Sequence, residues 1–247
     1  MDITENQLLR SIDQTNLSPS ITQAEIVAFV TRARAYGFCS VAVMPVWIPL
    51  ATQLLQGSQT TVAAAVAFPL GTCTTFAKVA ETKWSIEHGP GSIEIDMVMN
   101  VPLMKSARYD ALEEDIRAVV EVAQGHVVKV IIEVPVLSRE EIVIASLIAE
   151  KAGADFIKTS TGFKALKHWR PSTPDDVRLI KSAVGNTMRI KVAGGISTLP
   201  QALAVLEAGA SRIGTSMGDT IVDTFREETC NEKQGRLDFP DRLESSF

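Results

Sequence analysis

The chain alternates between short apolar runs and longer segments whose apolar residues recur with the period of a helix. The short runs predict eight strands, at residues 11–17, 38–44, 61–68, 92–99, 127–134, 155–160, 188–194 and 211–216. Several of these runs are nearly continuous in Val, Ile and Ala rather than strictly alternating. Such runs are typical of parallel strands that are covered on both faces.

The segments between these runs predict helices, of which the clearest are 106–125, 138–153 and 198–209. Their ends carry the expected signals. Ser138 stands three residues before Glu141, which is the spacing of a capping box, and each of the three segments closes with a glycine. Helices therefore separate the predicted strands.

Alternation of strands and helices with short connections indicates right-handed βαβ units in an α/β protein. Eight strands within roughly 210 residues favour a closed (β/α)8 TIM barrel over an open doubly wound sheet. The pattern at 11–17 is the weakest of the eight strand predictions. Without this strand, a seven-stranded open sheet remains an alternative. No GxGxxG follows that strand, which argues against an open dinucleotide-binding sheet.

Composition sets limits on partners and location. The 247 residues are 46% hydrophobic, and we expect one barrel domain over 1–247 with a loose polar tail from about residue 231. The net charge of −5 argues against nucleic acid as a partner. Three cysteines without CxxC spacing indicate a reducing compartment. With no signal-peptide pattern and no long apolar run, we expect a cytoplasmic protein away from the membrane.

Charged residues inside the predicted strands are the first functional signal. A charged side chain on a barrel strand must point into the interior, since the other face packs against apolar helices. Four of these residues are interpreted as interior ion pairs that hold the barrel together. They are Glu94, Lys129, Glu133 and Arg189.

Asp96, Lys158 and Lys191 differ because each lies in the last third of its strand, at the end that forms the active face of a barrel. An amine attacks a carbonyl only when it is unprotonated. Burial and a second ammonium nearby both disfavour the charged form of a lysine, which brings the amine into the range of a Schiff-base nucleophile. The carboxylate of Asp96 is then placed to shuttle protons or to hold the second lysine.

These residues sit in stretches that resemble the deoxyribose-phosphate aldolase family, and the resemblance runs from about residue 12 to residue 218. Its most specific stretches are EIDMVMN (94–100), KVIIE (129–133), AGADFIKTSTGF (152–163), KVAGGIST (191–198) and AGASRIGTS (208–216). The resemblance implies a (β/α)8 barrel that reversibly cleaves 2-deoxy-D-ribose 5-phosphate to acetaldehyde and D-glyceraldehyde 3-phosphate without metal or other cofactor.

The resemblance also implies roles for three residues. Lys158 matches the Schiff-base lysine, Lys191 the second lysine that perturbs it, and Asp96 the acidic member of the proton relay. The implied partner is a small phosphorylated sugar. Whether the chain forms a homo-oligomer stays open.

A phosphate site is also predicted from the residues themselves. Small residues after strand ends let backbone N–H groups approach an anion, and the loops after strands 7 and 8 form the recurrent phosphate site of such barrels. The hydroxyls of Thr159, Ser160 and Thr161 are expected to line the approach to the lysine. The predicted phosphate-binding residues are Thr161, Gly162, Gly194, Gly195, Gly214 and Ser216.

The chain departs from the family pattern around the expected pocket. The departures are at Ala42, Met44, Val134, Pro135 and Met217, and in the bulky, basic stretch KALKHWRPST at 164–173. In that stretch, Lys164, Lys167, His168 and Arg170 are either solvated or available to a different anionic group. The reaction type is therefore better specified than the substrate.

Two alternatives follow. One is a Schiff-base aldolase paralogue that takes another aldehyde or phosphorylated substrate. The other is a non-catalytic barrel that binds a sugar phosphate, against which the presence of both lysines and of Asp96 argues.

Overall fold

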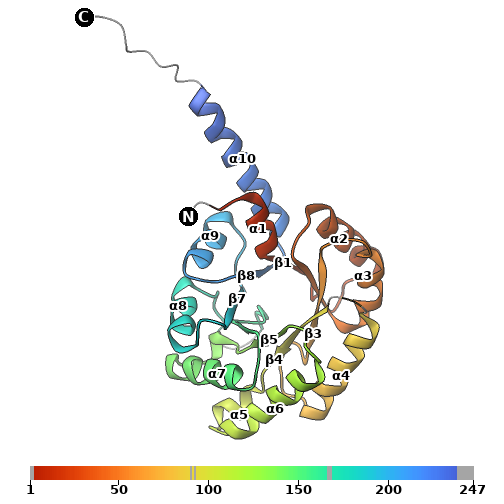
Figure 1. Cartoon of the computed structure of the whole chain (residues 1–247), viewed down its shortest axis with the longest axis vertical. Helices are drawn as coiled ribbons and strands as arrows, with labels where there is room; N and C mark the ends of the chain where they lie inside the picture. Colours follow the sequence, from red (N-terminus) through yellow and green to blue (C-terminus); the bar gives the residue numbers. More distant parts are fainter. Residues whose placement is uncertain (1–2, 90, 92, 166–168, 238–247) are drawn as a thin grey trace, which may run out of the picture.

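Eight parallel strands close into a barrel in sequence order, with helices around the outside (Figure 1). The computed structural model describes residues 3–89, 91, 93–165 and 169–237. The strands are β1 (Ile12–Thr15), β2 (Ser40–Val43), β3 (Thr61–Val66), β4 (Ile93–Val98), β5 (Val128–Ile131), β6 (Phe156–Lys158), β7 (Arg189–Ala193) and β8 (Arg212–Thr215). The prediction of eight strands and of a TIM barrel is therefore confirmed.

The weakest predicted strand is the one that closes the barrel. Strand β1 pairs in parallel with β2 on one side and with β8 on the other, so that Asp13 lies opposite both Ser40 and Gly214. The seven-stranded open sheet is therefore excluded.

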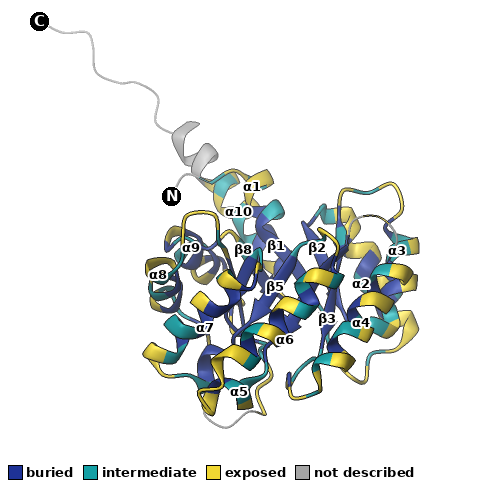
Figure 2. Ribbon diagram, turned by 60° about the horizontal axis from the view of Figure 1, so that its bottom comes forward, coloured by how far each residue is buried: buried dark blue, intermediate teal, exposed yellow. Residues whose placement is uncertain are grey.

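The helices cover the outer face of the barrel (Figure 2). They are α1 (Glu5–Ser11), α2 (Gln23–Tyr36), α3 (Ile48–Leu54), α4 (Thr75–His88), α5 (Val101–Lys105), α6 (Tyr109–Val122), α7 (Arg139–Lys151), α8 (Pro174–Ala183), α9 (Leu199–Glu207) and α10 (Gly218–Leu237), with short 3-10 turns η1 (Pro45–Trp47) and η2 (Val134–Val136). The capping box of Ser138 and Glu141 is present at the start of α7. The helix predicted at 106–125 begins at Tyr109, after a short helix that ends at Lys105.

The apolar runs of the strands are buried on both faces, as their composition predicts. Every residue of β2, β4 and β5 is buried. Side chains such as Val41, Ile95 and Val130 belong to the hydrophobic core. The charged residues of the same strands are left to face the barrel interior.

The predicted C-terminal tail overlaps the last helix. Helix α10 continues to Leu237, so the tail expected from about residue 231 begins within its final turns. Residues 238–247 lie outside the described part of the chain, so the loose polar tail stays a prediction for them. Among the described residues, no helix has both the length and the apolar composition that crossing a bilayer requires.

A buried ion pair joins two helices to the end of a barrel strand. The Lys78 ammonium on α4 lies 2.6 Å from a carboxylate oxygen of Asp115 on α6, and both side chains are almost completely buried. Lys78 also donates a hydrogen bond to the carbonyl of Val98, the last residue of β4 (2.9 Å). The hydroxyl of Thr75 donates to the other oxygen of Asp115 (2.8 Å).

Replacing Asp115 by Ala is expected to lower the free energy of unfolding by about 3–5 kcal/mol, because the Lys78 ammonium would stay buried without its counter-charge. Urea unfolding measures this loss. The control is the double variant Lys78→Met/Asp115→Leu, which removes both charges and is expected to recover most of the stability. A double variant no more stable than Asp115→Ala would contradict the explanation.

Candidate active site

One carboxylate gathers three ammonium groups inside the barrel. An oxygen of Asp96, on β4, accepts hydrogen bonds from Lys158 Nζ (2.6 Å) and Lys191 Nζ (2.8 Å). Its other oxygen accepts from Lys129 Nζ at 2.7 Å. The parallel register places Lys129 opposite Asp96 and Lys191 opposite Lys158. The three residues predicted to carry the chemistry therefore meet, together with a lysine that was assigned to structure.

The electrostatics of the cluster separate its members. Burial favours the neutral form of Asp96, but the three ammonium groups outweigh it and hold the pKa of that carboxyl well below its usual range. Burial also lowers the pKa of Lys158 to about 8, and Lys191 adds to this shift against the opposing pull of Asp96. Lys129, in contact with several carboxylates, has its pKa raised although burial opposes the charge. Lys158 is thus the lysine that can lose its proton near neutral pH.

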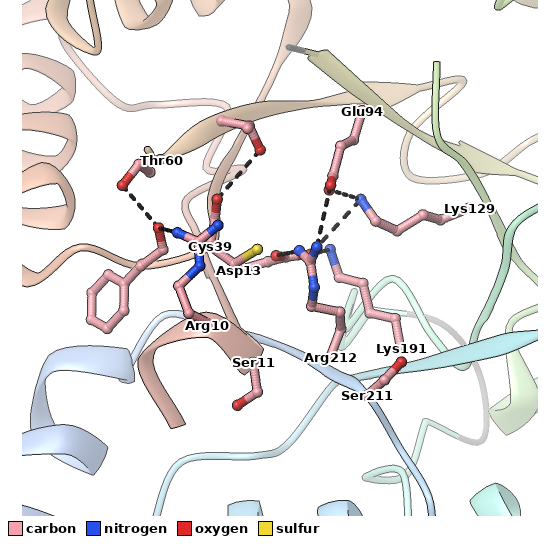
Figure 3. A network of polar contacts seen from close by, with 12 residues as sticks. Arg10, Ser11, Asp13, Cys39, Thr60, Glu94, Lys129, Lys191, Ser211 and Arg212 are labelled. Carbon is pink, nitrogen blue, oxygen red and sulfur yellow. Dashed lines mark hydrogen bonds and ion pairs between the residues drawn. The ribbon is translucent and has the colours of Figure 1, made fainter. Parts of the chain in front are cut away.

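The network continues toward the opposite end of the barrel (Figure 3). Lys129 Nζ lies 2.6 Å from Glu94, and Lys191 Nζ lies 2.6 Å from Asp13. The guanidinium of Arg212 contacts both of these carboxylates, at 2.6 Å for Asp13 and 3.3 Å for Glu94.

Asp13 and Arg212 were missed by the sequence analysis, although the rule that charges on barrel strands point inward applies to both. Asp13 is the second residue of β1 and is completely buried. Arg212 is the first residue of β8, and its side chain is largely buried. Applying that rule to the two terminal strands would have found them.

Two of the four residues that were predicted to form interior ion pairs do not form them. Glu133 follows β5 and accepts hydrogen bonds from the Ser160 hydroxyl (2.7 Å) and the Thr161 amide (3.0 Å). It therefore fixes the loop after the reactive lysine through neutral donors. Arg189 begins β7 at the rim, where its 46% exposed side chain lies 3.6 Å from Asp155. Glu94 and Lys129 do form the expected interior pair.

A cavity of about 680 Å³ opens above Lys158. It is lined by Lys158 together with all six predicted phosphate-binding residues, which are Thr161, Gly162, Gly194, Gly195, Gly214 and Ser216. Lys191 and Asp96 are buried outside this lining. The cavity therefore meets the charge network at Lys158.

The glycines around the cavity have different physical reasons. Gly194 and Gly195 adopt φ values of +87° and +90°, which other residues rarely adopt, and a Cβ on Gly195 would stand 2.4 Å from Pro171. Gly214 was expected to follow a strand end, and this is wrong. It lies within β8, where a Cβ would stand 3.1 Å from the Lys191 stem. Gly214 leaves room for that lysine.

The three hydroxyls after Lys158 do not all line the cavity, contrary to expectation. Thr159 is buried and accepts a hydrogen bond from the Ala193 amide (3.0 Å). Ser160 is buried and accepts from the Gly162 amide (3.0 Å), so that amide already has a partner. Thr161 lines the cavity. The buried hydroxyls hold the loop in place.

The segment after Phe163 contributes to the cavity wall. Lys164, Trp169 and Pro171 line it, and Met217 lines it from the loop after β8. Trp169 was not singled out in the sequence. Arg170 is held by Asp176 through two contacts of 2.7 Å.

Other expectations for this region have mixed outcomes. Lys167 and His168 lie outside the described residues. Among the remaining departures, Ala42, Val134 and Pro135 are buried. They and Met44 are not part of the cavity lining.

A closed barrel whose mouth presents a lysine amine of lowered pKa, beside a carboxylate and a second lysine, meets the requirements of a Schiff-base aldolase. The geometry therefore points to this class of enzyme.

Comparisons with known proteins agree with this class. The family model of the DeoC/LacD family aldolases matches residues 8–223. A deoxyribose-phosphate aldolase of Geobacillus sp. strain WCH70 is 46% identical over 220 residues, which are 89% of this chain and 96% of that protein. The chain belongs to the DeoC/LacD aldolase family, and its curated relatives include proteins named deoxyribose-phosphate aldolase.

Solved structures show the same fold. The structure of a putative deoxyribose-phosphate aldolase from Coccidioides immitis superposes with a TM-score of 0.85 at 36% identity, over 91% of this chain and 87% of that one. A deoxyribose phosphate aldolase from Aeropyrum pernix, described as tetrameric, has a TM-score of 0.82 at 28% identity, over 91% of this chain and 93% of that one.

The lowered pKa of Lys158 predicts the pH dependence of adduct formation. The neutral amine is the nucleophile, so a pKa of about 8 leaves about a tenth of it reactive at pH 7. Trapping with acetaldehyde and borohydride, followed by mass spectrometry of the peptide that holds Lys158, is expected to rise with pH to a plateau, with its midpoint near 8. A midpoint at the pKa of a free lysine would contradict the shift.

Proposed function

We propose that this chain catalyses the reversible cleavage of 2-deoxy-D-ribose 5-phosphate to acetaldehyde and D-glyceraldehyde 3-phosphate, with Lys158 as the Schiff-base residue. The observation that carries the proposal is the position of Lys158. Among the described residues, it is the member of the buried charge network that also lines the large cavity. The names of the relatives support the substrate.

The chemistry begins at Lys158 Nζ. The neutral amine adds to the C1 aldehyde of the open-chain sugar, and loss of water from the resulting carbinolamine forms an iminium. The C2–C3 bond then breaks as the C3 hydroxyl loses its proton, and the bond electrons move toward the iminium to give an enamine. Protonation of the enamine at C2 and addition of water release acetaldehyde and restore the amine.

Asp96 and Lys191 are proposed to move the protons that these steps require. A single oxygen of Asp96 lies 2.6 Å from Lys158 Nζ and 2.8 Å from Lys191 Nζ, which is within reach for direct proton transfer. The low pKa of Asp96 keeps it a carboxylate between the two amines, so it can pass a proton from one nitrogen to the other without retaining it.

The phosphate group is proposed to lie at the loops after β7 and β8. Gly194 and Gly195 follow β7, Ser216 follows β8, and Thr161 and Gly162 follow β6. A Cβ on Gly162 would stand 3.4 Å from Gly194, so the loops after β6 and β7 lie side by side. Backbone N–H groups of such loops suit a phosphate. The proposed partner is thus a small phosphorylated sugar, and the acidic net charge of the chain argues against nucleic acid.

A second candidate is an aldolase of the same mechanism with another aldehyde or phosphorylated substrate. Trp169 and Met217 favour it, because both place large apolar side chains in the cavity wall. Measuring acetaldehyde release from deoxyribose 5-phosphate separates the two candidates. Turnover typical of an enzyme on its own substrate supports the first, and Lys158-dependent adduct formation without that turnover supports the second.

Lys158→Ala is expected to reduce cleavage of deoxyribose 5-phosphate to the uncatalysed rate while the far-ultraviolet circular dichroism stays that of the unchanged protein. The reason is that the variant cannot form the iminium. The matched control is Lys164→Ala, which removes another cavity lysine and is expected to keep most of kcat. Substantial lyase activity in Lys158→Ala would refute the assignment of the nucleophile.

Inorganic phosphate is expected to inhibit competitively, because it would occupy the glycine-lined end of the cavity in place of the substrate phosphate. Initial rates at several substrate and phosphate concentrations, at constant ionic strength, test this. The control replaces phosphate by a chloride salt at the same ionic strength, which separates binding of phosphate from general screening of charges by salt. Rates indifferent to phosphate would count against the anion site.

A further inference from the structure

The buried charges form a closed ring of alternating sign. Within the described residues, each carboxylate of the ring contacts two cations of the ring and each cation contacts two of its carboxylates, at distances of 3.3 Å or less. In order around the ring, the members are Arg212, Asp13, Lys191, Asp96, Lys129 and Glu94. Three carboxylates therefore match three cations, and the ring is neutral when all six are charged.

Lys158 is outside this ring. It joins at one point, where its ammonium meets the Asp96 oxygen that Lys191 also contacts. Every carboxylate of the ring already has two cationic neighbours without it. Lys158 is consequently a fourth cation beside three carboxylates, and no carboxylate of the ring is left to it alone.

Arg212 closes the ring at the end opposite Lys158. One guanidinium nitrogen lies 2.6 Å from an oxygen of Asp13, and the other lies 3.3 Å from an oxygen of Glu94. The second oxygen of each carboxylate contacts a lysine, Lys191 for Asp13 and Lys129 for Glu94. The planar fork of a guanidinium suits this bridging role, and the charge that it brings is what balances the ring.

We propose that Arg212 is a positioning residue for the aldol reaction, which closes a neutral ring of six charges and thereby leaves Lys158 as the cation without a counter-charge of its own. The inference rests on the proposed function, since it concerns the amine that attacks the aldehyde. Arg212 contacts neither the cavity nor Lys158 and acts through Asp13, Glu94 and the two ring lysines.

The charge count determines the sign of each change. Without the Arg212 cation the ring carries one excess negative charge, which favours the protonated form of Lys158. Without the Glu94 carboxylate the ring carries one excess positive charge, which favours the neutral amine. The charged groups around Lys158 are the ring members, Glu133 beyond β5, which bonds the Ser160 hydroxyl, and Lys164 across the cavity.

The experiment measures the pH dependence of borohydride-trapped acetaldehyde adduct at Lys158, and of kcat/KM, in Arg212→Met, Glu94→Gln and the double variant. In each variant, the rising limb of the pH profile reports the pKa of Lys158. In Arg212→Met this limb is expected to move up by about one pH unit, which corresponds to about tenfold less adduct at neutral pH. The Glu94→Gln limb is expected to move down. The double variant, whose ring is again balanced, is expected to return toward the unchanged protein.

Arg189→Met is the matched control. Arg189 also begins a barrel strand, and its guanidinium lies over the ring of Phe156 at 4.1 Å, as that of Arg212 does at 5.8 Å. Its ion pair is with Asp155, outside the ring of charges. The substitution removes the same charge, and the pH limb is expected to stay in place.

The outcomes separate this inference from the proposed function. If the unchanged protein forms no adduct at Lys158 at any pH, the proposed function fails. If it forms the adduct but Arg212→Met and Glu94→Gln shift the limb in the same direction or not at all, or Arg189→Met shifts it as much, the positioning role of Arg212 is overturned.

Arg212→Lys covers the case in which Arg212→Met does not fold. This variant keeps the charge, so its limb is expected to stay near that of the unchanged protein while the Glu94→Gln limb still moves down. An unmoved Glu94→Gln limb then overturns the inference.

Discussion

An ammonium group inside a protein barrel is tolerable only beside a carboxylate, and this constraint governs the interior of the molecule. Lys129 and Lys191 have no exposed surface, and each is held between two carboxylates. Removing one partner of such a set leaves a buried charge whose desolvation is uncompensated. The carboxylates that satisfy this requirement come from β1 and β4, so the closure of the barrel and the balance of its charges depend on each other.

The lysine with the lowered pKa lies at the edge of this charge network. Lys158 belongs to the same network but lies at its edge, under a cavity of about 680 Å³, and its pKa is lowered to about 8 by burial first and by Lys191 in addition. The pKa of Lys129 is raised by the neighbouring carboxylates, whereas Lys158 can exchange its proton near neutral pH. A structural network and a reactive group are thus parts of one arrangement.

The cavity is lined by residues other than those of the buried charge network, apart from Lys158. The cavity wall comes mostly from loops after the strands, with the glycines that are proposed to bind the phosphate and with Trp169 and Met217 among the larger side chains. The loop after β6 is anchored by hydrogen bonds that are separate from the interior charges, because Glu133 accepts from the Ser160 hydroxyl and the Thr161 amide. Apart from Lys158, the residues that line the cavity and the residues of the charge network around Asp96 are therefore different sets.

Local sequence patterns predict the eight strands, the cap of α7 and the three residues that are proposed to carry the chemistry. Those features are written in local patterns, such as an apolar run, a Ser138–Glu141 spacing, or a lysine near the end of a strand. Only the folded barrel shows that Asp13 and Arg212 complete the charge ring, that Gly214 makes room for Lys191, and that Glu133 anchors a loop. The physical reason is that these contacts join residues far apart in sequence, such as Asp13 and Arg212, and that the register and closure of the strands select the partners.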